Sequence, residues 1–179
     1  IRDYLWVNSG TVVTTTTAQT VNSVAFPARD INGSTNGEGV NVAILVTTAT
    51  TNAGAITNTT MSYTNSDGTA GRTATMASFP ATAVAGTFVM FQLAAGDKGV
   101  RSIQSVTLGT TYGGGAISLV AFTNLTLVPN TVVNVGGQQF PIPANPGIRV
   151  YNGTCAIPGY LASATTATNV TGMIAVMER

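Results

Sequence analysis

The sequence predicts an all-β protein: an antiparallel β-sandwich, jelly-roll-like in its winding, with extended loops or an arm. Thr and Val are abundant, and β-branched side chains suit a pleated sheet better than a helix. Asn and Gly recur about every ten residues, in the manner of turns between short strands. No window places apolar residues at the i, i+3, i+4 and i+7 positions of an amphipathic helix. Little or no helix is therefore expected.

The first half of the chain contains five expected strands. They span residues 4–7, 12–21, 40–50, 57–64 and 72–76. Hydroxyl groups on both faces of the Thr-rich stretch 12–21 suit the edge of a sheet. Apolar side chains alternate at Val42, Ile44 and Val46, which marks 40–50 as a core strand. Strands 57–64 and 72–76 flank Asn65-Ser66-Asp67-Gly68, where Asp-Gly supplies the positive φ of a hairpin turn.

The second half contains four expected strands. They span residues 87–93, 100–108, 116–128 and 172–176. The strand 87–93 is apolar on both faces, which favours a central place in the sandwich or cover by a neighbouring subunit. Asp97-Lys98-Gly99 predicts a turn before the next strand. The apolar parity of strand 100–108 changes between Ile103 and Val106, which indicates a β-bulge.

One sandwich domain over residues 1–179 is expected, because the chain has no low-complexity linker and no clear internal repeat. Within it, residues 129–158 hold five of the seven prolines, beside Gly136-Gly137. Proline cannot donate to a sheet ladder and is therefore rare in central strands. The segment 129–158 is either a set of long surface loops or an arm that crosses onto a neighbouring subunit.

Charge is scarce in this chain. Asp, Glu, Lys and Arg make up 7% of the residues, where about 25% is typical of soluble proteins. So few charges give a free monomer little repulsion against association. Either an assembly covers much of the surface, or the hydroxyl- and amide-rich surface itself binds a ligand. A net charge of +1 with scattered basic residues argues against a nucleic-acid partner. Apolar runs such as 42–46 are too short to span a membrane, which takes roughly 18 residues.

Catalytic chemistry is not expected. The chain has no histidine, the side chain that most often acts as a general base. The sole lysine, Lys98, lies in a turn-like stretch, where a low-pKa amine is not favoured. Asp30 and Glu38 are the one pair of carboxylates away from predicted turns and from the termini, and both lie in a Gly-rich loop. Cys155 has no partner for an internal disulfide and is expected to be a small buried apolar residue.

The loop that begins at Asp30 also has some features of a calcium site. Oxygen-bearing side chains alternate along it, as in part of an EF-hand. The pattern fails at the sixth position, where Thr35 replaces Gly, and at the twelfth, where Asn41 replaces Glu. A Gly- and Asn-rich loop between strands explains the same residues without a metal. We therefore assign no catalytic, cofactor-binding or metal-binding residue, and no cofactor.

Three stretches of the sequence resemble virion structural proteins of tailed bacteriophages. They are TNTTMSYTNSDGTAGRTAT (57–75), FPATAVAGTF (79–88) and AAGDKGVRS (94–102), within a resemblance that covers about residues 40–125. The resemblance implies a β-sandwich or jelly-roll subunit of a phage particle, located in the virion. It implies first a capsid decoration (cement) protein, and second a tail or collar component.

The implied partners are the major capsid protein and further copies of the chain in a homo-oligomer, with no nucleic acid and no membrane. The residues alone leave a carbohydrate-binding or adhesive β domain as an alternative, with a glycan as its ligand. Its candidate sugar-stacking side chains are Tyr63, Tyr112 and Tyr151. Isolated aromatic residues on strands more often belong to a core or an interface.

Overall fold

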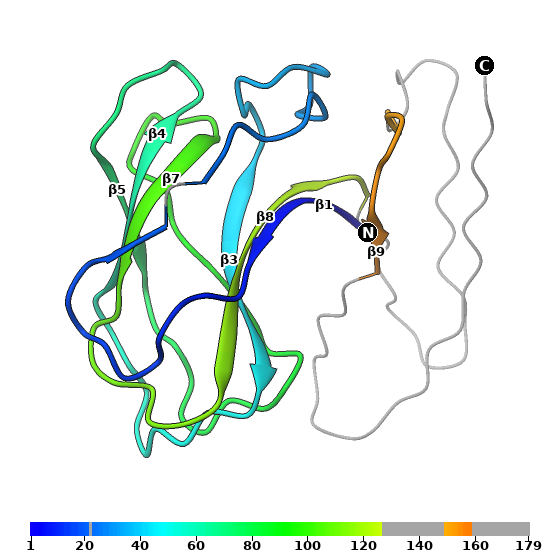
Figure 1. Cartoon of the computed structure of the whole chain (residues 1–179). Helices are drawn as coiled ribbons and strands as arrows, with labels where there is room; N and C mark the ends of the chain where they lie inside the picture. The colour runs from blue at the N-terminus through cyan, green and yellow to red at the C-terminus, as the bar shows by residue number, and fades with distance from the viewer. Residues whose placement is uncertain (22, 127–148, 159–179) are drawn as a thin grey trace.

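Two antiparallel sheets pack face to face in the computed structural model, which describes residues 1–21, 23–126 and 149–158 (Figure 1). The larger sheet has the order β6-β3-β8-β1-β9 and the smaller one the order β2-β7-β4-β5. The strands are β1 (Arg2–Asn8), β2 (Gln19–Thr20), β3 (Asn41–Thr48), β4 (Thr59–Asn65), β5 (Arg72–Met76), β6 (Phe88–Met90), β7 (Val100–Thr107), β8 (Ala116–Asn124) and β9 (Ala156–Ile157). The predicted all-β sandwich is confirmed. Over the described ranges there is no helix capable of crossing a bilayer.

Eight of the strands form nested antiparallel pairs. β1 pairs with β8, β2 with β7, β3 with β6, and β4 with β5, and successive pairs belong to alternate sheets. β9 lies outside this nest and pairs with β1 at Arg2 and Asp3. The sandwich body is thus complete without β9.

The core lies between the two sheets. From β3 it receives Val42, Ile44 and Val46, all buried as their alternation predicts. Tyr112 stacks on Phe79 within the core, with ring centroids 4.2 Å apart. Each large apolar side chain removed from water in this way contributes about 1.5–3 kcal/mol. Burial of these side chains between the two sheets is therefore a main source of the stability of the sandwich.

Two local predictions are confirmed by the pairing of the strands. β4 and β5 form the expected hairpin, and Gly68 in its loop has a φ of 86°. The register of β7 against β4 shifts between Ile103 and Ser105, so that Gln104 is the extra residue of a bulge. The change of apolar parity along the sequence therefore marked a real irregularity in the strand.

Several boundaries and positions differ from the prediction. The stretch 12–21 forms a strand only at Gln19–Thr20, although that strand does lie at a sheet edge. The reason is local: Gln19 Nε2 donates to the carbonyls of Val12 and Thr15, and its Oε1 accepts from the Val12 amide, which closes the rest into a loop. The turn expected at 97–99 lies slightly earlier, where the Asp97 amide donates to the Ala94 carbonyl.

The strand expected at 87–93 is not central. It is the short strand β6, at the edge of the larger sheet. After Met90 the chain leaves this sheet, and Gln92 exchanges two backbone hydrogen bonds with Thr75 of β5. The strand that is buried on both faces is β8, in the middle of the sheet.

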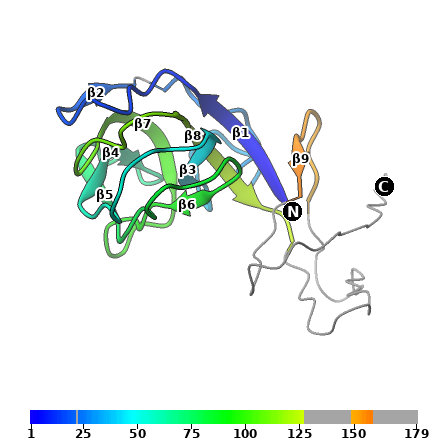
Figure 2. The ribbon, with the colours of Figure 1, turned by 90° about the horizontal axis from the view of Figure 1, so that it is seen from below.

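The Pro-rich segment 129–158 is described only from residue 149 onwards. Residues 149–158 make a turn from Tyr151 to Thr154 and then the short strand β9. Figures 1 and 2 both place β9 beside the amino end of β1. The rest of the predicted segment, the end of the strand expected at 116–128, and the strand expected at 172–176 lie outside the described residues.

Candidate docking surface

Asp30, one of the two carboxylates in the Gly-rich loop, has a structural role. Asp30 is 1% exposed, and its carboxylate accepts five hydrogen bonds. The donors are the amides of Asn32 (2.9 Å), Ser34 (2.7 Å), Gly37 (3.1 Å) and Glu38 (3.2 Å), together with Ser34 Oγ (2.6 Å). Burial raises the pKa of the Asp30 carboxyl, but the hydrogen bonds from Ser34, Asn32 and Glu38 outweigh burial and hold it below its usual value. A carboxylate saturated by N–H and O–H donors has no lone pair directed at a cation or a substrate.

The remaining candidates for chemistry stand apart from one another. The Glu38 carboxylate accepts from Asn32 Nδ2 at 2.7 Å on an exposed surface. Lys98 is exposed, and so is Cys155, which corrects the expectation that this cysteine is buried. Cys155 is exposed because it precedes a strand that lies outside the core. Among residues 1–21, 23–126 and 149–158, no three His, Cys, Asp or Glu side chains cluster as metal ligands would.

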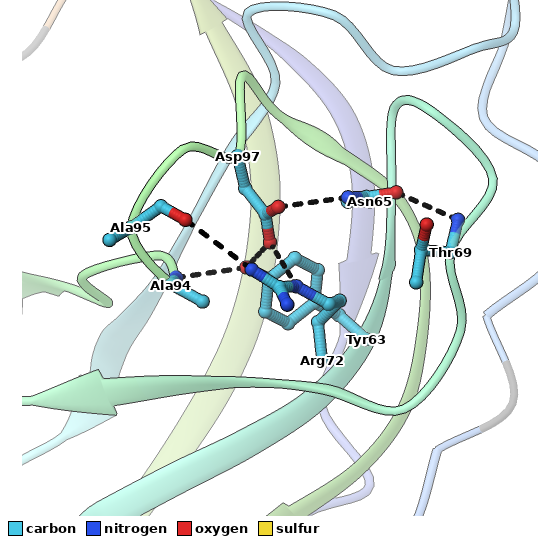
Figure 3. A network of polar contacts seen from close by, with 7 residues as sticks. All are labelled: Tyr63, Asn65, Thr69, Arg72, Ala94, Ala95 and Asp97. Carbon is cyan, nitrogen blue, oxygen red and sulfur yellow. Dashed lines mark hydrogen bonds and ion pairs between the residues drawn. The ribbon is translucent and has the colours of Figure 1, made fainter.

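A polar network joins the loop before β7 to the β4–β5 hairpin (Figure 3). The Asp97 carboxylate accepts from Arg72 Nε at 2.9 Å, from Asn65 Nδ2 at 2.8 Å, and from the Tyr63 hydroxyl. The Tyr63 hydroxyl in turn accepts from the Ala94 amide at 3.0 Å. The Arg72 hydrogen bond, followed by the Tyr63 hydrogen bond, lowers the pKa of Asp97 to about 2. The network therefore ties the loop that carries Ala94 and Asp97 to the β4–β5 hairpin.

This network predicts a loss of stability in acid. The pKa of Asp97 is about 2 in the folded state and about 3.9 in an unfolded chain. Its stabilising effect is therefore complete above about pH 4 and disappears as the pH falls towards about 2. Urea unfolding at a series of pH values should show a shallower fall across this window for Asp97→Asn than for the parent chain. Some fall remains in the variant, because the pKa of Asp30 is also lowered. Parallel pH profiles for the two chains would contradict this account.

The tyrosines proposed as a sugar-stacking platform do not form one. Tyr63 and Tyr112 are fully buried in the core. Burial raises the pKa of Tyr112 to about 12, and its hydroxyl shares a 2.8 Å hydrogen bond with Thr59. Tyr151 is half-buried, with its ring against Gly33. Two of the three rings therefore have no face to offer to a sugar.

The surface that stands out is the outer face of the larger sheet, which faces away from the core. Neighbouring side chains on this face follow from the strand register. Tyr4 lies opposite Phe122, Val7 opposite Val120, Ala43 opposite both Val120 and Met90, and Leu45 opposite Phe88. Sandwiches ordinarily place polar residues on such a face. Here a run of apolar side chains crosses β6, β3, β8 and β1.

Small and aromatic residues pack tightly on this outer face. Ala43, Val120 and Phe122 form a second buried cluster, separate from the main core. The ring of Phe88 packs edge-on against Phe122 at 5.2 Å and is stacked with Tyr4 at 6.4 Å. The rings of Phe88 on β6 and Tyr4 on β1 thus cover the small residues Ala43 and Val120 between them.

One charged side chain closes this layer. The guanidinium of Arg2 lies 4.2 Å from the ring centroid of Phe88 and 5.1 Å from that of Phe122. These distances are within cation–π range. Arg2 therefore packs on the aromatic rings while its charge can remain hydrated. We call the exposed part of this layer the aromatic face. Its residues are Arg2, Tyr4, Val7, Leu45, Phe88 and Met90.

The aromatic face remains partly open to solvent. Val7 is 52% exposed and Met90 is 39% exposed, while Tyr4, Leu45 and Phe88 are half-buried. Contiguous apolar surface of this kind marks interaction sites, and aromatic, Met and Arg side chains are enriched at interfaces. The sequence contained a signal for it: the runs 42–46 and 119–122 are apolar at successive positions, as strands buried on both faces are. The alternation of Val42, Ile44 and Val46 indicated only the inner face of the strand.

Comparison of the chain with known protein families, with curated proteins and with solved structures finds no match.

Proposed function

We propose that this chain is a non-enzymatic structural subunit of a bacteriophage particle, which binds the capsid shell as a decoration (cement) protein. The aromatic face is the observation that supports the proposal most. A sheet that presents Tyr4, Phe88 and Met90 outward, on a chain with 7% charged residues, is suited to be covered by another protein. Asp30 and Asp97 accept hydrogen bonds from groups within the chain, which agrees with a role that needs no reactive group.

The winding of the strands gives further support. Pairs β1–β8, β2–β7, β3–β6 and β4–β5, in alternating sheets, follow the order of an eight-stranded jelly roll. We infer that the sandwich is a jelly roll on this ground. Viral capsid domains use this architecture, but lectin domains do too. The fold therefore supports the proposal without deciding it, and the aromatic face favours a protein partner.

Cement action would be a linkage effect. A chain that binds assembled shells but not dissociated capsid subunits stabilises the shell by mass action, about 2.7 kcal/mol per site at a hundredfold excess over Kd. The expected result is that added chain raises the temperature or denaturant concentration at which empty phage shells dissociate, and that the shift saturates with dose. Shells that dissociate at the same point with and without the chain would contradict the proposal.

Two other functions remain as alternatives. A tail or collar component could use the same aromatic face, and electron microscopy of labelled particles would place the chain on that part and not on the shell. A carbohydrate-binding or adhesive domain is less well supported, because Tyr63 and Tyr112 are buried. Specific hits on a glycan array, together with no binding to shells, would favour that reading.

A further inference from the structure

The segment 149–158 has the properties of a separable arm. β9 is an extra strand outside the eight nested ones, and no residue of the segment belongs to either buried apolar cluster of the described chain. Cys155, Ala156 and Pro158 are exposed. The apolar core of the sandwich therefore does not depend on contacts with this segment.

The contact between arm and body is nevertheless specific. Arg2 and Asp3 pair with Ile157 and Ala156 in an antiparallel ladder, and the Tyr4 amide continues it with a 3.1 Å bond to the Cys155 carbonyl. The edge of β1 therefore presents a recognition site for a short strand.

Asp3 adds a side-chain contact to this ladder. Its carboxylate is 1% exposed and accepts from Arg29 Nε at 2.8 Å and from the Cys155 amide at 2.8 Å. The ring of Tyr151 packs so closely on Gly33 that a Cβ at Gly33 would lie 2.7 Å from Tyr151 Cε1. A buried ion pair and a glycine thus both serve the docking of the arm.

Nothing in this contact requires that arm and body belong to the same copy. Residues 127–148 connect β8 to the arm, and 22 residues can span up to about 75 Å, which exceeds the diameter of about 35 Å for a domain of this size. An arm exchanged between two copies makes the same hydrogen bonds as an arm docked on its own subunit, as in domain swapping. The outcome then depends on the local concentration of neighbouring copies.

We propose that the amino-terminal edge of β1, Arg2–Tyr4, is the acceptor for the arm 149–158 of a second copy of the chain. The arms link neighbouring subunits through strand addition, with Asp3 and Arg29 of the acceptor holding the Cys155 amide of the donor. The inference rests on the proposed function for the close spacing of copies on a shell, and it names the contact between them. Reciprocal exchange makes each link bivalent, so that two short ladders hold where one would dissociate.

Covalent trapping tests this inference directly. The donor is the parent chain, whose one cysteine is Cys155. The acceptor carries Tyr4→Cys with Cys155→Ser and a distinguishing tag, and it cannot close a disulfide within itself. The matched control acceptor carries Val7→Cys with Cys155→Ser; Val7 lies on the same strand and is exposed, but it lies beyond the ladder with β9. Donor and acceptor are mixed at high concentration, oxidised mildly, and resolved by mass on non-reducing gels.

The expected result is a donor–acceptor disulfide that forms at least about tenfold more with the Tyr4→Cys acceptor than with the Val7→Cys control. Equal yields would overturn the proposal. So would a chain with Tyr4→Cys alone that closes only within itself at every concentration. Should Tyr4→Cys fail to fold, an Arg2→Cys acceptor and an Ile157→Cys donor, both with Cys155→Ser, probe the adjacent pair of the ladder and are judged in the same way.

Shell binding of the parent chain separates this inference from the proposed function, because Tyr4 itself belongs to the aromatic face. Donor–acceptor disulfides in the variants, together with a parent chain that does not bind shells, would refute the decoration role and leave arm exchange standing. A parent chain that binds shells, together with no donor–acceptor disulfide in the variants, would refute arm exchange and leave the decoration role standing.

Discussion

Replacing Leu119 by alanine is expected to lower the free energy of unfolding by about 3–4 kcal/mol. Leu119 is fully buried on the inner face of β8, the strand at the middle of the larger sheet. Its neighbours across the sheet are Ile44 of β3 and Asn8 of β1. A hole at this position cannot collapse easily, because strands on both sides fix the backbone. The cost therefore includes the cavity as well as the lost transfer energy.

Equilibrium urea unfolding, followed by fluorescence, measures this loss. Leu119→Met is the matched control, since it keeps the volume and should cost less than about 1.5 kcal/mol. If Leu119→Ala and Leu119→Met unfold at the same urea concentration, the packing described for the centre of the sandwich is wrong.

Replacing Asp30 by alanine is expected to cost about 3 kcal/mol, although this carboxylate has no catalytic role. The change leaves the amides of Ser34, Gly37 and Glu38 without their acceptor. Gly37 is itself buried with a φ of 83°, and a Cβ there would lie 2.0 Å from the Val100 carbonyl oxygen. The loop thus has little freedom to turn its amides to water, and the loss should spread to the start of β7.

Asn36→Ala is the control in the same loop, because the Asn36 side chain is exposed. It should change the free energy of unfolding by less than about 0.5 kcal/mol. Hydrogen exchange provides a second readout: the amides of Ser34 and Gly37 should lose protection in Asp30→Ala and keep it in Asn36→Ala. An Asp30→Ala chain as stable as Asn36→Ala would show that the carboxylate does not organise the loop.

Local patterns predicted the fold well where they reflected local physics. The Asp-Gly hairpin at residues 65–68, the bulge near Gln104 and the buried face of β3 are all present. Errors arose where particular contacts override the strand propensity of a stretch. The stretch 12–21 has strand propensity throughout, but the Gln19 side chain closes most of it into a loop. The stretch 87–93 is apolar on both faces yet forms an edge strand. Its outward apolar side chain Phe88 is accommodated because it packs on the cluster that contains Ala43 of the neighbouring strand β3.

The candidate docking surface could not be predicted from the sequence, although its residues were visible. Arg2 and Tyr4 are at one end of the chain, Phe88 is in the middle, and Phe122 is far beyond. Only the register of four strands brings them together. The bulge at Leu5 matters most here, because it turns Val7 to the same face as Tyr4. No local sequence pattern predicts this bulge, which brings Val7 to the same face as Tyr4.

The most direct test of the central claim measures binding to empty phage shells by cosedimentation, for the parent chain and two variants. The double variant Val7→Asp, Met90→Asp places two charges on the aromatic face at exposed positions, so folding should persist. The control Val24→Asp changes an apolar side chain that is 70% exposed and follows the edge strand of the smaller sheet. We predict saturable binding for the parent and for Val24→Asp, and at least a tenfold weaker affinity for the double variant, about 1.4 kcal/mol or more. A folded double variant that binds shells as tightly as the parent would contradict the assignment of the aromatic face as the docking surface.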